Sequence, residues 1–153
     1  MTIDYAALPQ LFAAAVPFSG FLGIEYGEVG PGHAVLRLAD DPAKHNHIGT
    51  LHAGALYSLA ESASGVAMIA AVADRLAGVT PLAARAEITY RKVARGDVTA
   101  TARIDDVPGV LAALDADGRV RFPIVVELAD AAGDVCAVVT VDWHLRREDH
   151  PNE

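Results

Sequence analysis

Residues 45–73, HNHIGTLHAGALYSLAESASGVAMIAAVA, decide the fold because they form a long apolar run with a single charged side chain, Glu61. The segment from His52 to about Asp74 has the length and content of a helix, and Gly78 favours its end. Small residues occupy all sides of this segment, so a sheet can approach it closely and wrap it. We therefore predict a buried central helix.

Glu61 lies in the middle of this predicted helix. Burying an unpaired carboxylate costs several kcal/mol, or the group takes up a proton and its pKa rises. Glu61 is therefore the first candidate for chemistry. The alternative is a structural carboxylate paired with Tyr57, His52 or an arginine.

The remaining segments predict one helix and a hairpin before the central helix, and four strands after it. We expect a helix over residues 4–15 that Pro17 stops, and strands over 23–29 and 33–39 around Gly30-Pro31-Gly32. Residues 40–49 read as a loop. The later strands are expected in two pairs, 83–93 with 97–106 joined at Arg95-Gly96, and 119–130 with 134–146, with a short helix over 108–116 between the pairs.

This order predicts an α+β fold in which a curved antiparallel sheet wraps a long central helix, the hotdog architecture. At 153 residues the chain is most simply one domain. We expect an N-terminal helix and lead-in over residues 1–20, a single hotdog domain over 21–147, and a tail over 148–153.

Composition narrows the compartment and the partners. The net charge of −8 argues against nucleic acid and against an anionic membrane surface, although a local basic cluster could still hold an anionic ligand. The N-terminus lacks the basic region of a secretory signal, and His52 and Glu61 interrupt the longest apolar run, so we expect no membrane span and a cytoplasmic protein. The single cysteine, Cys136, lies in an apolar run and is read as a buried structural thiol.

Four residues in the quoted stretch stand at a spacing with a known parallel. His52 follows Asn46 by six residues, Gly54 comes two later, and Glu61 follows His52 by nine. This pattern resembles the signature of hotdog acyl-CoA thioesterases of the PaaI and 4-hydroxybenzoyl-CoA types, which carry Asn or Gln, then His-Gly-Gly, then Asp or Glu. Residues 90–97 are similar to the basic strand end that precedes a Gly-Asp turn in that family. The resemblance covers most of the chain after residue 20.

The resemblance implies a hydrolase that cleaves an acyl-CoA thioester with no metal and no organic cofactor, coenzyme A being part of the substrate. Three features depart from the family pattern. Ala53 replaces the first glycine, Gly65 stands where some members carry a hydroxyl that Ser62 or Ser64 would then supply, and residues 108–116 form an insertion. These departures point to an uncharacterised branch.

Thioester hydrolysis needs a group that polarises the carbonyl and a group that attacks or activates water. Backbone N–H groups at a helix N-terminus are unpaired and lie at the positive end of the helix dipole, so those of Ala53 and Gly54 suit the first role. Glu61 suits the second, as general base or nucleophile. By resemblance, Asn46 would hydrogen-bond the attacking water or the thioester, although it could equally be a turn residue. His52 is read as a structural residue at the helix start rather than a catalytic base.

Further residues are candidates for substrate binding. Arg91, Lys92 and Arg95 cluster near one strand end and would contact the phosphates of coenzyme A, the alternative being a solvated basic strand end. Tyr57 is expected to line the acyl tunnel, and Thr80 is a candidate for orienting water.

A zinc site is the reading that a run of histidines invites, but it lacks support. His45, His47 and His52 have no cysteine or carboxylate at ligand spacing, so no metal is expected. Trp143 is read as a packing residue.

Helix geometry predicts that the site is shared between two chains. The nine residues from His52 to Glu61 correspond to roughly 13.5 Å and about 900° of rotation, which leaves the two residues on opposite faces of the helix. One helix cannot bring the Ala53 amide and Glu61 to the same carbonyl, whereas an antiparallel copy can. The resemblance agrees, and an apolar content of 52% also favours an interface. We expect an obligate homodimer with shared active sites, and the dimers could pair into a tetramer.

Three rival functions stay open. The substrate could be an acyl carrier protein thioester instead of an acyl-CoA, and the protein could bind an acyl group or coenzyme A without catalysis. A hotdog hydratase or dehydratase is the third, although the sequence offers no second motif with a His–Asp or His–Glu pair.

Overall fold

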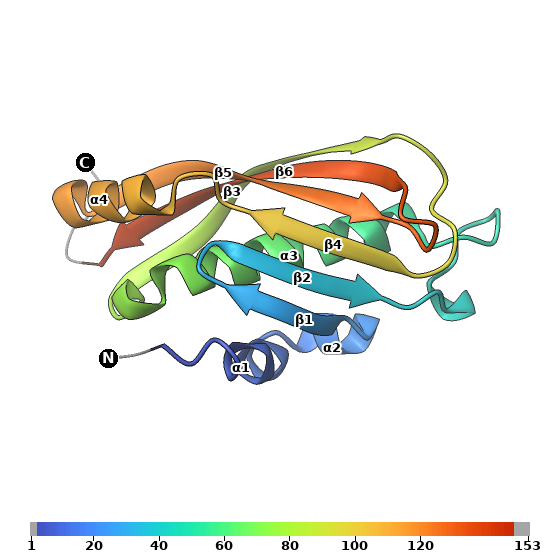
Figure 1. Ribbon diagram of the computed structural model, residues 1–153, viewed down its shortest axis with the longest axis horizontal. Helices are drawn as coiled ribbons and strands as arrows, with labels where there is room; N and C mark the ends of the chain where they lie inside the picture. The colour runs from blue at the N-terminus through green and yellow to red at the C-terminus, as the bar shows by residue number, and fades with distance from the viewer. Residues whose placement is uncertain (1–2, 149–153) are drawn as a thin grey trace.

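The computed structural model describes residues 3–148 and confirms the hotdog fold, a curved six-stranded antiparallel sheet wrapped around one long helix (Figure 1). The order of the strands across the sheet is β1-β2-β4-β5-β6-β3. The elements are α1 Leu8–Ala15, α2 Pro17–Leu22, β1 Glu25–Gly30, β2 His33–Leu38, the short 3₁₀ helix η1 Pro42–Lys44, α3 Ala53–Val72, the 3₁₀ helix η2 Ala73–Arg75, β3 Val79–Tyr90, β4 Val98–Arg103, α4 Val107–Asp117, β5 Arg119–Ala129 and β6 Val135–Arg147.

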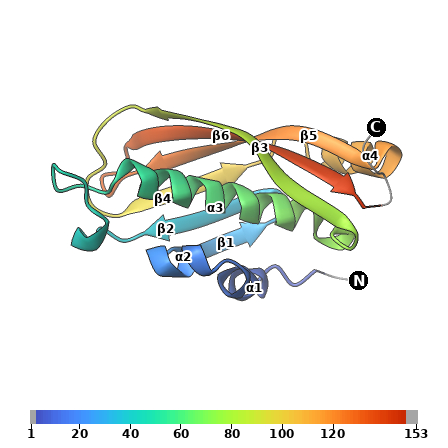
Figure 2. The ribbon, with the colours of Figure 1, turned by 180° about the vertical axis from the view of Figure 1, so that it is seen from behind.

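The central helix α3 is the core of the molecule, as the sequence predicts. Leu59, Ala60, Ala63 and Ala67 are fully buried against the concave side of the sheet, along which α3 runs (Figure 2). Residues 53–75 are long and apolar enough to cross a membrane, but 67% of that apolar stretch is buried inside the protein. The helix is therefore a core helix of the domain.

The expected pairing of the third and fourth strands is wrong. β3 pairs only with β6 and forms an edge of the sheet, whereas β4 lies between β2 and β5. The chain leaves β3 at Tyr90 and enters β4 at Val98, and this connection is too long for a two-residue hairpin. It crosses the end of the sheet instead, held by the backbone N–H groups of Arg91 and Lys92, which donate to the carbonyl of Cys136.

Two prolines act differently from the expectation. Pro17 does not merely end the first helix, because it occupies the first turn of α2, where its missing N–H is tolerated. β3 begins at Val79, four residues before the predicted start at residue 83. It therefore includes Pro81, which an edge strand can accommodate. The expected boundary between the N-terminal lead-in and the hotdog domain, at residues 20 and 21, falls inside α2 and stays a prediction. The expected tail lies outside the described residues from 149 onward.

The predicted hairpin and the predicted inserted helix are both present. β1 and β2 pair around a turn in which Gly32 has a φ of +69°, and a Cβ at this position would lie 2.4 Å from Val107 Cγ2. α4 covers one end of the sheet through Val110 and Leu114. Its Asp115 accepts from both Arg75 and Arg147, which ties α4 to the end of the central helix and to β6.

Candidate active site at the start of the central helix

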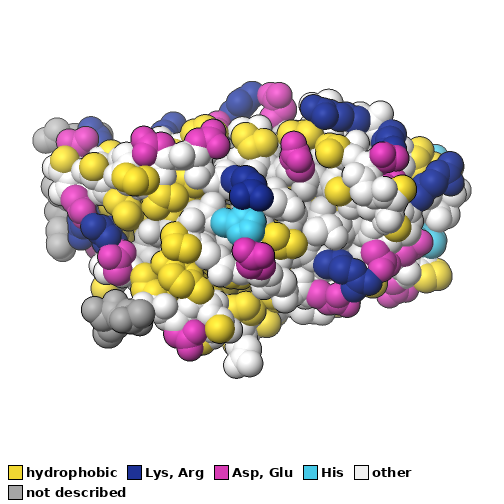
Figure 3. Space-filling model, viewed as in Figure 1, with side chains coloured by type: hydrophobic (Ala, Val, Ile, Leu, Met, Phe, Trp, Pro, Cys, Tyr) yellow, Lys and Arg dark blue, Asp and Glu magenta, His cyan; other side chains and the backbone are white. Residues whose placement is uncertain are grey.

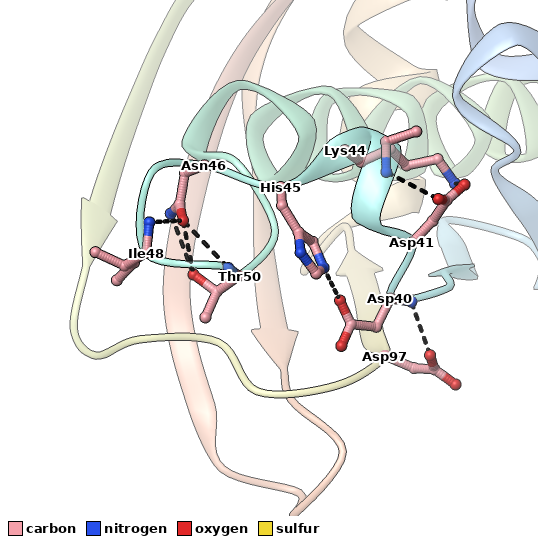
Figure 4. Close-up of polar contacts among 9 residues, drawn as sticks. Asp40, Asp41, Lys44, His45, Asn46, Ile48, Thr50 and Asp97 are labelled. Carbon is pink, nitrogen blue, oxygen red and sulfur yellow. Dashed lines mark hydrogen bonds and ion pairs between the residues drawn. The ribbon is translucent and has the colours of Figure 1, made fainter.

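The loop between β2 and α3 fixes the start of the central helix (Figure 4). His45 Nε2 lies 2.6 Å from Asp40 Oδ1, and the Asp40 N–H donates to Asp97 Oδ1 over 2.8 Å. At the neck of the loop the His52 N–H donates to the Lys44 carbonyl over 2.9 Å. These contacts hold residues 45–52 against β2 and the start of β4.

Asn46 is engaged within this loop. Its Oδ1 accepts from the backbone N–H groups of Ile48 and Thr50 at 3.0 and 3.2 Å, and its Nδ2 donates to Thr50 Oγ1 at 3.1 Å (Figure 4). In this chain both ends of the amide therefore serve the loop, which matches the turn-residue alternative. The second N–H of the Asn46 Nδ2 group stays able to donate to a water or a thioester, whereas Oδ1 already accepts from the loop.

His52 caps the central helix. Its Nδ1 accepts from the Gly54 N–H over 2.8 Å, and its own backbone is extended, as is usual for a capping residue. An accepting Nδ1 places the proton of the neutral ring on Nε2. His52 thus caps the helix start, and its ring occupies one of the two amides expected to polarise the substrate.

The second amide remains open. Within residues 3–148 the Ala53 N–H has no hydrogen-bond acceptor, and the exposed backbone around it is the positive end of a 20-residue helix. Of the two predicted amides, Ala53 is the one able to receive an oxyanion as the helix stands. Gly54 becomes available only if the His52 ring turns away.

Glu61 is half-buried on the same helix, and its carboxylate has no hydrogen-bond or ion-pair partner among the described residues. The alternative of a structural carboxylate paired with Tyr57, His52 or an arginine is therefore wrong within this chain. Burial raises the pKa of Glu61 above its ordinary value. A partly dry carboxyl with a raised pKa is the state expected of a general base or a carboxylate nucleophile.

Glu61 belongs to the one stripe of α3 that the sheet does not cover. The half-exposed positions of the helix recur every three or four residues, which places them on one face. They are Tyr57, Ser58, Glu61, Ser62, Gly65 and Ile69.

The edge strand β3 is also poorly covered, and it flanks β6, whose Trp143 lies beside Gly65 of this stripe. Ala83, Ala86 and Tyr90 are opposite the inward-facing residues of β6, so they face the side of the sheet that carries α3, yet all three are exposed. We call the uncovered stripe of α3 together with these inward-facing residues of β3 the α3–β3 face.

Tyr90 belongs to this face and makes a contact that the sequence does not predict. Its hydroxyl donates to the Ala53 carbonyl over 3.1 Å, which links the end of β3 to the first turn of α3. This contact closes the α3–β3 face at the helix N-terminus. Only the register of β3 against β6 reveals it, because 37 residues separate the two partners in the chain.

The raised pKa of Glu61 gives the stability of the protein a specific pH dependence. The folded state holds the proton more tightly than the unfolded state, so the contribution of Glu61 is most favourable below the ordinary value of 4.5 and declines as pH rises through the raised folded pKa. We expect Glu61→Gln to match the native protein near pH 4 and to exceed its thermal midpoint at about pH 8. Thermal unfolding across this range measures the difference, and a constant difference at all pH values would contradict the burial of Glu61.

The basic residues after β3 are partly free. Arg91 and Arg95 are exposed and have no carboxylate partner among the described residues, whereas Lys92 forms an ion pair with Asp134. An open cleft of about 750 Å³ lies here, lined by Lys92, Val93, Arg95, Gly96, Asp130, Ala131, Ala132 and Asp134. The cleft has room for a phosphate-bearing group beside the unpaired guanidinium of Arg95, whereas Arg91 is not one of its lining residues.

The other predicted residues divide between the two faces of the sheet. Tyr57 is half-buried on the α3–β3 face, as expected for a residue of the acyl tunnel. Thr80 lies opposite Arg146 near the start of β3, one position out of phase with the inward-facing Pro81, so it belongs to the outer face of the sheet. Within one chain Thr80 is therefore remote from Glu61.

Cys136 is a buried thiol, and the histidines within residues 3–148 form no group that could hold a metal ion. Cys136 is buried, its thiol donates to the Leu128 carbonyl, and burial raises its pKa, as expected of a structural thiol. No three His, Cys, Asp or Glu side chains in this range gather in a way that could hold a metal ion.

Basic and acidic side chains are interspersed on the outer face of the sheet (Figure 3).

Comparison with known proteins agrees with this description. The profile of a family described as a domain of unknown function, DUF4442, matches residues 5–145. No curated protein matches the chain.

Solved structures share the whole architecture. A Pseudomonas aeruginosa protein described as being of unknown function and a probable thioesterase has 26% sequence identity and a TM-score of 0.84, over 96% of this chain and 98% of that one. A thioesterase family protein from Silicibacter pomeroyi has 20% identity and a TM-score of 0.74, over 94% and 99% of the two chains. The PaaI protein of the E. coli phenylacetic acid degradation operon has 19% identity and a TM-score of 0.70, over 92% and 95%.

Proposed function

Since the chain belongs to the DUF4442 family and has the hotdog fold of thioesterase-family proteins, we propose that it hydrolyses an acyl-CoA thioester. The observation that carries the proposal is the half-buried Glu61, which has a raised pKa and no partner in its own chain. The open amide of Ala53 at the start of the same helix supplies the second group that the reaction needs.

The chemistry follows from these two groups. The Ala53 N–H, at the positive end of α3, polarises the thioester carbonyl and stabilises the oxyanion that forms on its oxygen. Glu61 either takes a proton from the attacking water or attacks the carbonyl carbon itself, and the thiolate of coenzyme A leaves and is protonated. In the second case a mixed anhydride of Glu61 forms, and water hydrolyses it to release the acid and regenerate the carboxylate. Asn46 acts by holding the loop that presents the helix start. No metal or organic cofactor takes part.

Two copies of the chain are needed to assemble one such site. Eight residues separate Ala53 from Glu61, which is about 12 Å along the helix. A second chain whose helix runs antiparallel would bring its Ala53 amide to this Glu61. The α3–β3 face and the unpaired outer edge of β3 supply the surface for this contact, since an open strand edge pairs readily with another strand.

We therefore propose a homodimer with two shared sites, and we leave open whether dimers pair into tetramers. Sedimentation should give at least twice the 16.0 kDa mass of the chain. A strictly monomeric protein that still hydrolysed acyl-CoA would contradict the shared site. No nucleic acid or membrane partner is proposed, and the cytoplasm remains the expected compartment.

Arg91 and Arg95 are proposed to contact the phosphates of coenzyme A. We expect Arg91→Ala and Arg95→Ala each to raise KM for an acyl-CoA by about tenfold with kcat little changed, because a charge-assisted hydrogen bond to phosphate contributes to binding away from the reacting bond. Lys92→Ala should have a smaller effect because Asp134 already neutralises Lys92. Steady-state kinetics at low salt measures the three variants, and equal effects on kcat would argue against a binding role.

Hydrolysis of a panel of acyl-CoAs tests the proposed function, with release of the free thiol as the readout. If every member of the panel is hydrolysed more slowly than about one turnover per hour, the result favours the non-catalytic binding protein. Acyl groups on an acyl carrier protein belong in the same panel.

A hydratase or dehydratase stays as a second candidate because of one observation. The sequence offers no motif for a His–carboxylate pair, but the fold brings His45 and Asp40 together at 2.6 Å. A 2-enoyl-CoA is therefore included in the panel. Hydration is followed by the loss of its absorbance, which separates hydratase activity from thioester hydrolysis. Hydration that survives Glu61→Gln and disappears in His45→Ala would replace our proposal.

A further inference from the structure

Trp143 of β6 lies beside Gly65 of α3, one helical turn after Glu61, and this arrangement bears on which acyl group the site can bind. Trp143 is the only tryptophan of the chain, and its side chain points from β6 toward α3 with an exposed fraction of 8%. It lies between Ala83 of β3 and Phe122 of β5. The indole therefore sits behind the α3–β3 face.

A chain of hydrogen bonds fixes the indole relative to Glu61. The Trp143 Nε1–H donates to Ser64 Oγ over 3.1 Å, and the Ser64 hydroxyl donates to the backbone carbonyl of Glu61 over 2.7 Å. Ser64 is fully buried, so neither contact competes with solvent. The hydroxyl of Ser64 is used for this purpose and does not hold the carboxylate of Glu61.

Gly65 lies beside the edge of this buried indole and places no side chain against it. A Cβ at position 65 would lie 3.5 Å from Trp143 Cζ2 and 3.7 Å from Cη2, which is ordinary van der Waals contact. Neither strain nor a close backbone approach requires a glycine here, and glycine is unfavourable inside a helix. The space of one methyl group beside the indole is therefore a feature that the fold itself does not need.

The position of this space sets a direction for the acyl group. Gly65 follows Glu61 by four residues, or about 6 Å along the helix, on the same uncovered stripe. In the opposite direction the Tyr90–Ala53 contact closes the face. A chain that starts at a carbonyl beside Glu61 can extend toward Gly65. Ala83, which pairs with Trp143, and Ala86 are small inward-facing residues of the strand next to β6.

We propose that the Trp143 edge beside Gly65 is the contact surface for the acyl group, and that it selects acyl groups with an apolar body about 6 Å beyond the carbonyl. Medium-chain and arylacetyl groups meet this requirement, and acetyl does not. The proposal rests on the proposed thioesterase function, because it takes Glu61 as the position of the thioester carbonyl. Gly65 is a specificity-determining residue in this scheme and Ser64 is a positioning residue.

The single tryptophan provides a direct test in the Glu61→Gln protein, which should bind acyl-CoA without turnover. Tryptophan emission is followed during titration with hexanoyl-CoA, phenylacetyl-CoA, acetyl-CoA and free coenzyme A. We expect a saturable shift with the first two ligands and none with acetyl-CoA or coenzyme A. Binding of hexanoyl-CoA that calorimetry detects while the emission stays unchanged overturns the contact with Trp143 and leaves the thioesterase proposal intact. Absence of binding by every acyl-CoA overturns both.

Filling the space tests the role of Gly65 separately. In Gly65→Ala we expect the dissociation constant of hexanoyl-CoA to rise about tenfold and that of acetyl-CoA to stay unchanged, since a single methyl group in a pocket discriminates by this order. Gly20→Ala is the matched control, because Gly20 lies in α2 with nothing within 4 Å of the added Cβ. Gly65→Ser adds the same Cβ and replaces the alanine variant if that variant fails to fold. Equal affinities of the native and filled proteins for hexanoyl-CoA overturn the proposal.

Discussion

Glu61→Gln is expected to lower kcat for acyl-CoA hydrolysis by about 10³-fold, because it removes the only carboxylate among the described residues of the α3–β3 face. KM should change little, since the amide is nearly the same size as the carboxyl and the proposed coenzyme A contacts lie elsewhere. The folded state should not suffer, because Glu61 forms no hydrogen bond or ion pair that the substitution could break within residues 3–148.

The control for this variant is a carboxylate without a place in the site. Glu127 is exposed on β5, on the outer face of the sheet, and Glu127→Gln makes the same chemical change there. Its kcat should stay within about twofold of the native value, as is usual for surface substitutions. If Glu61→Gln keeps the native rate with a thioester that the protein hydrolyses, Glu61 is not the catalytic group.

Ala53→Pro is expected to lower kcat by about 10²-fold, because it deletes the one open amide at the start of the helix. Proline is well suited to the first position of a helix, where its missing N–H is not needed for the fold. His52 already has the extended conformation, with φ −62° and ψ 142°, that a residue before proline adopts. The substitution therefore separates the chemistry of the amide from the stability of the helix.

Mixing the two inactive proteins tests whether the site is shared. If each site takes Glu61 from one chain and Ala53 from the other, a heterodimer of Glu61→Gln with Ala53→Pro contains one site with both native groups. Random exchange of subunits should then restore about a quarter of the native activity, because half of the dimers are mixed and half of their sites are intact.

One control variant and one alternative outcome complete the subunit-mixing experiment. Ala53→Gly keeps the amide and should retain the native kcat, which assigns the proline effect to the N–H and not to the side chain. Mixing that restores no activity, while labelled chains are shown to exchange, would place Glu61 and the Ala53 amide of the same chain in one site or remove the amide from the reaction.

The sequence predicts the parts of this molecule that depend on local periodicity and composition. The central helix, the β1–β2 hairpin and the inserted helix α4 all follow from apolar spacing, turn residues and caps, and the structure has them close to the predicted bounds. The isolation of Glu61 follows from the same reasoning, because a lone charge in an apolar helix is visible in the sequence.

The errors concern contacts between residues far apart in the chain. Tyr90 on Ala53, Trp143 on Ser64 and the edge position of β3 depend on which strands become neighbours, and the sequence order suggests the wrong neighbour for β3. The loss of the Gly54 amide has a different cause. A capping ring and a free amide both fit the residues 52–54, and only the orientation of the His52 side chain decides between them.

The open edge of β3 matters for newly made chains that have not yet associated with another copy. A free strand edge twelve residues long is a site at which newly made copies could add to one another without limit. Pro81 removes a backbone donor near one end, and the irregular register between Ala83 and Arg85 bends the strand in its middle. The register with β6 is uninterrupted over residues 86–90, so in the proposed homodimer this segment is the one available to pair with its copy, and such a pair would close the edge.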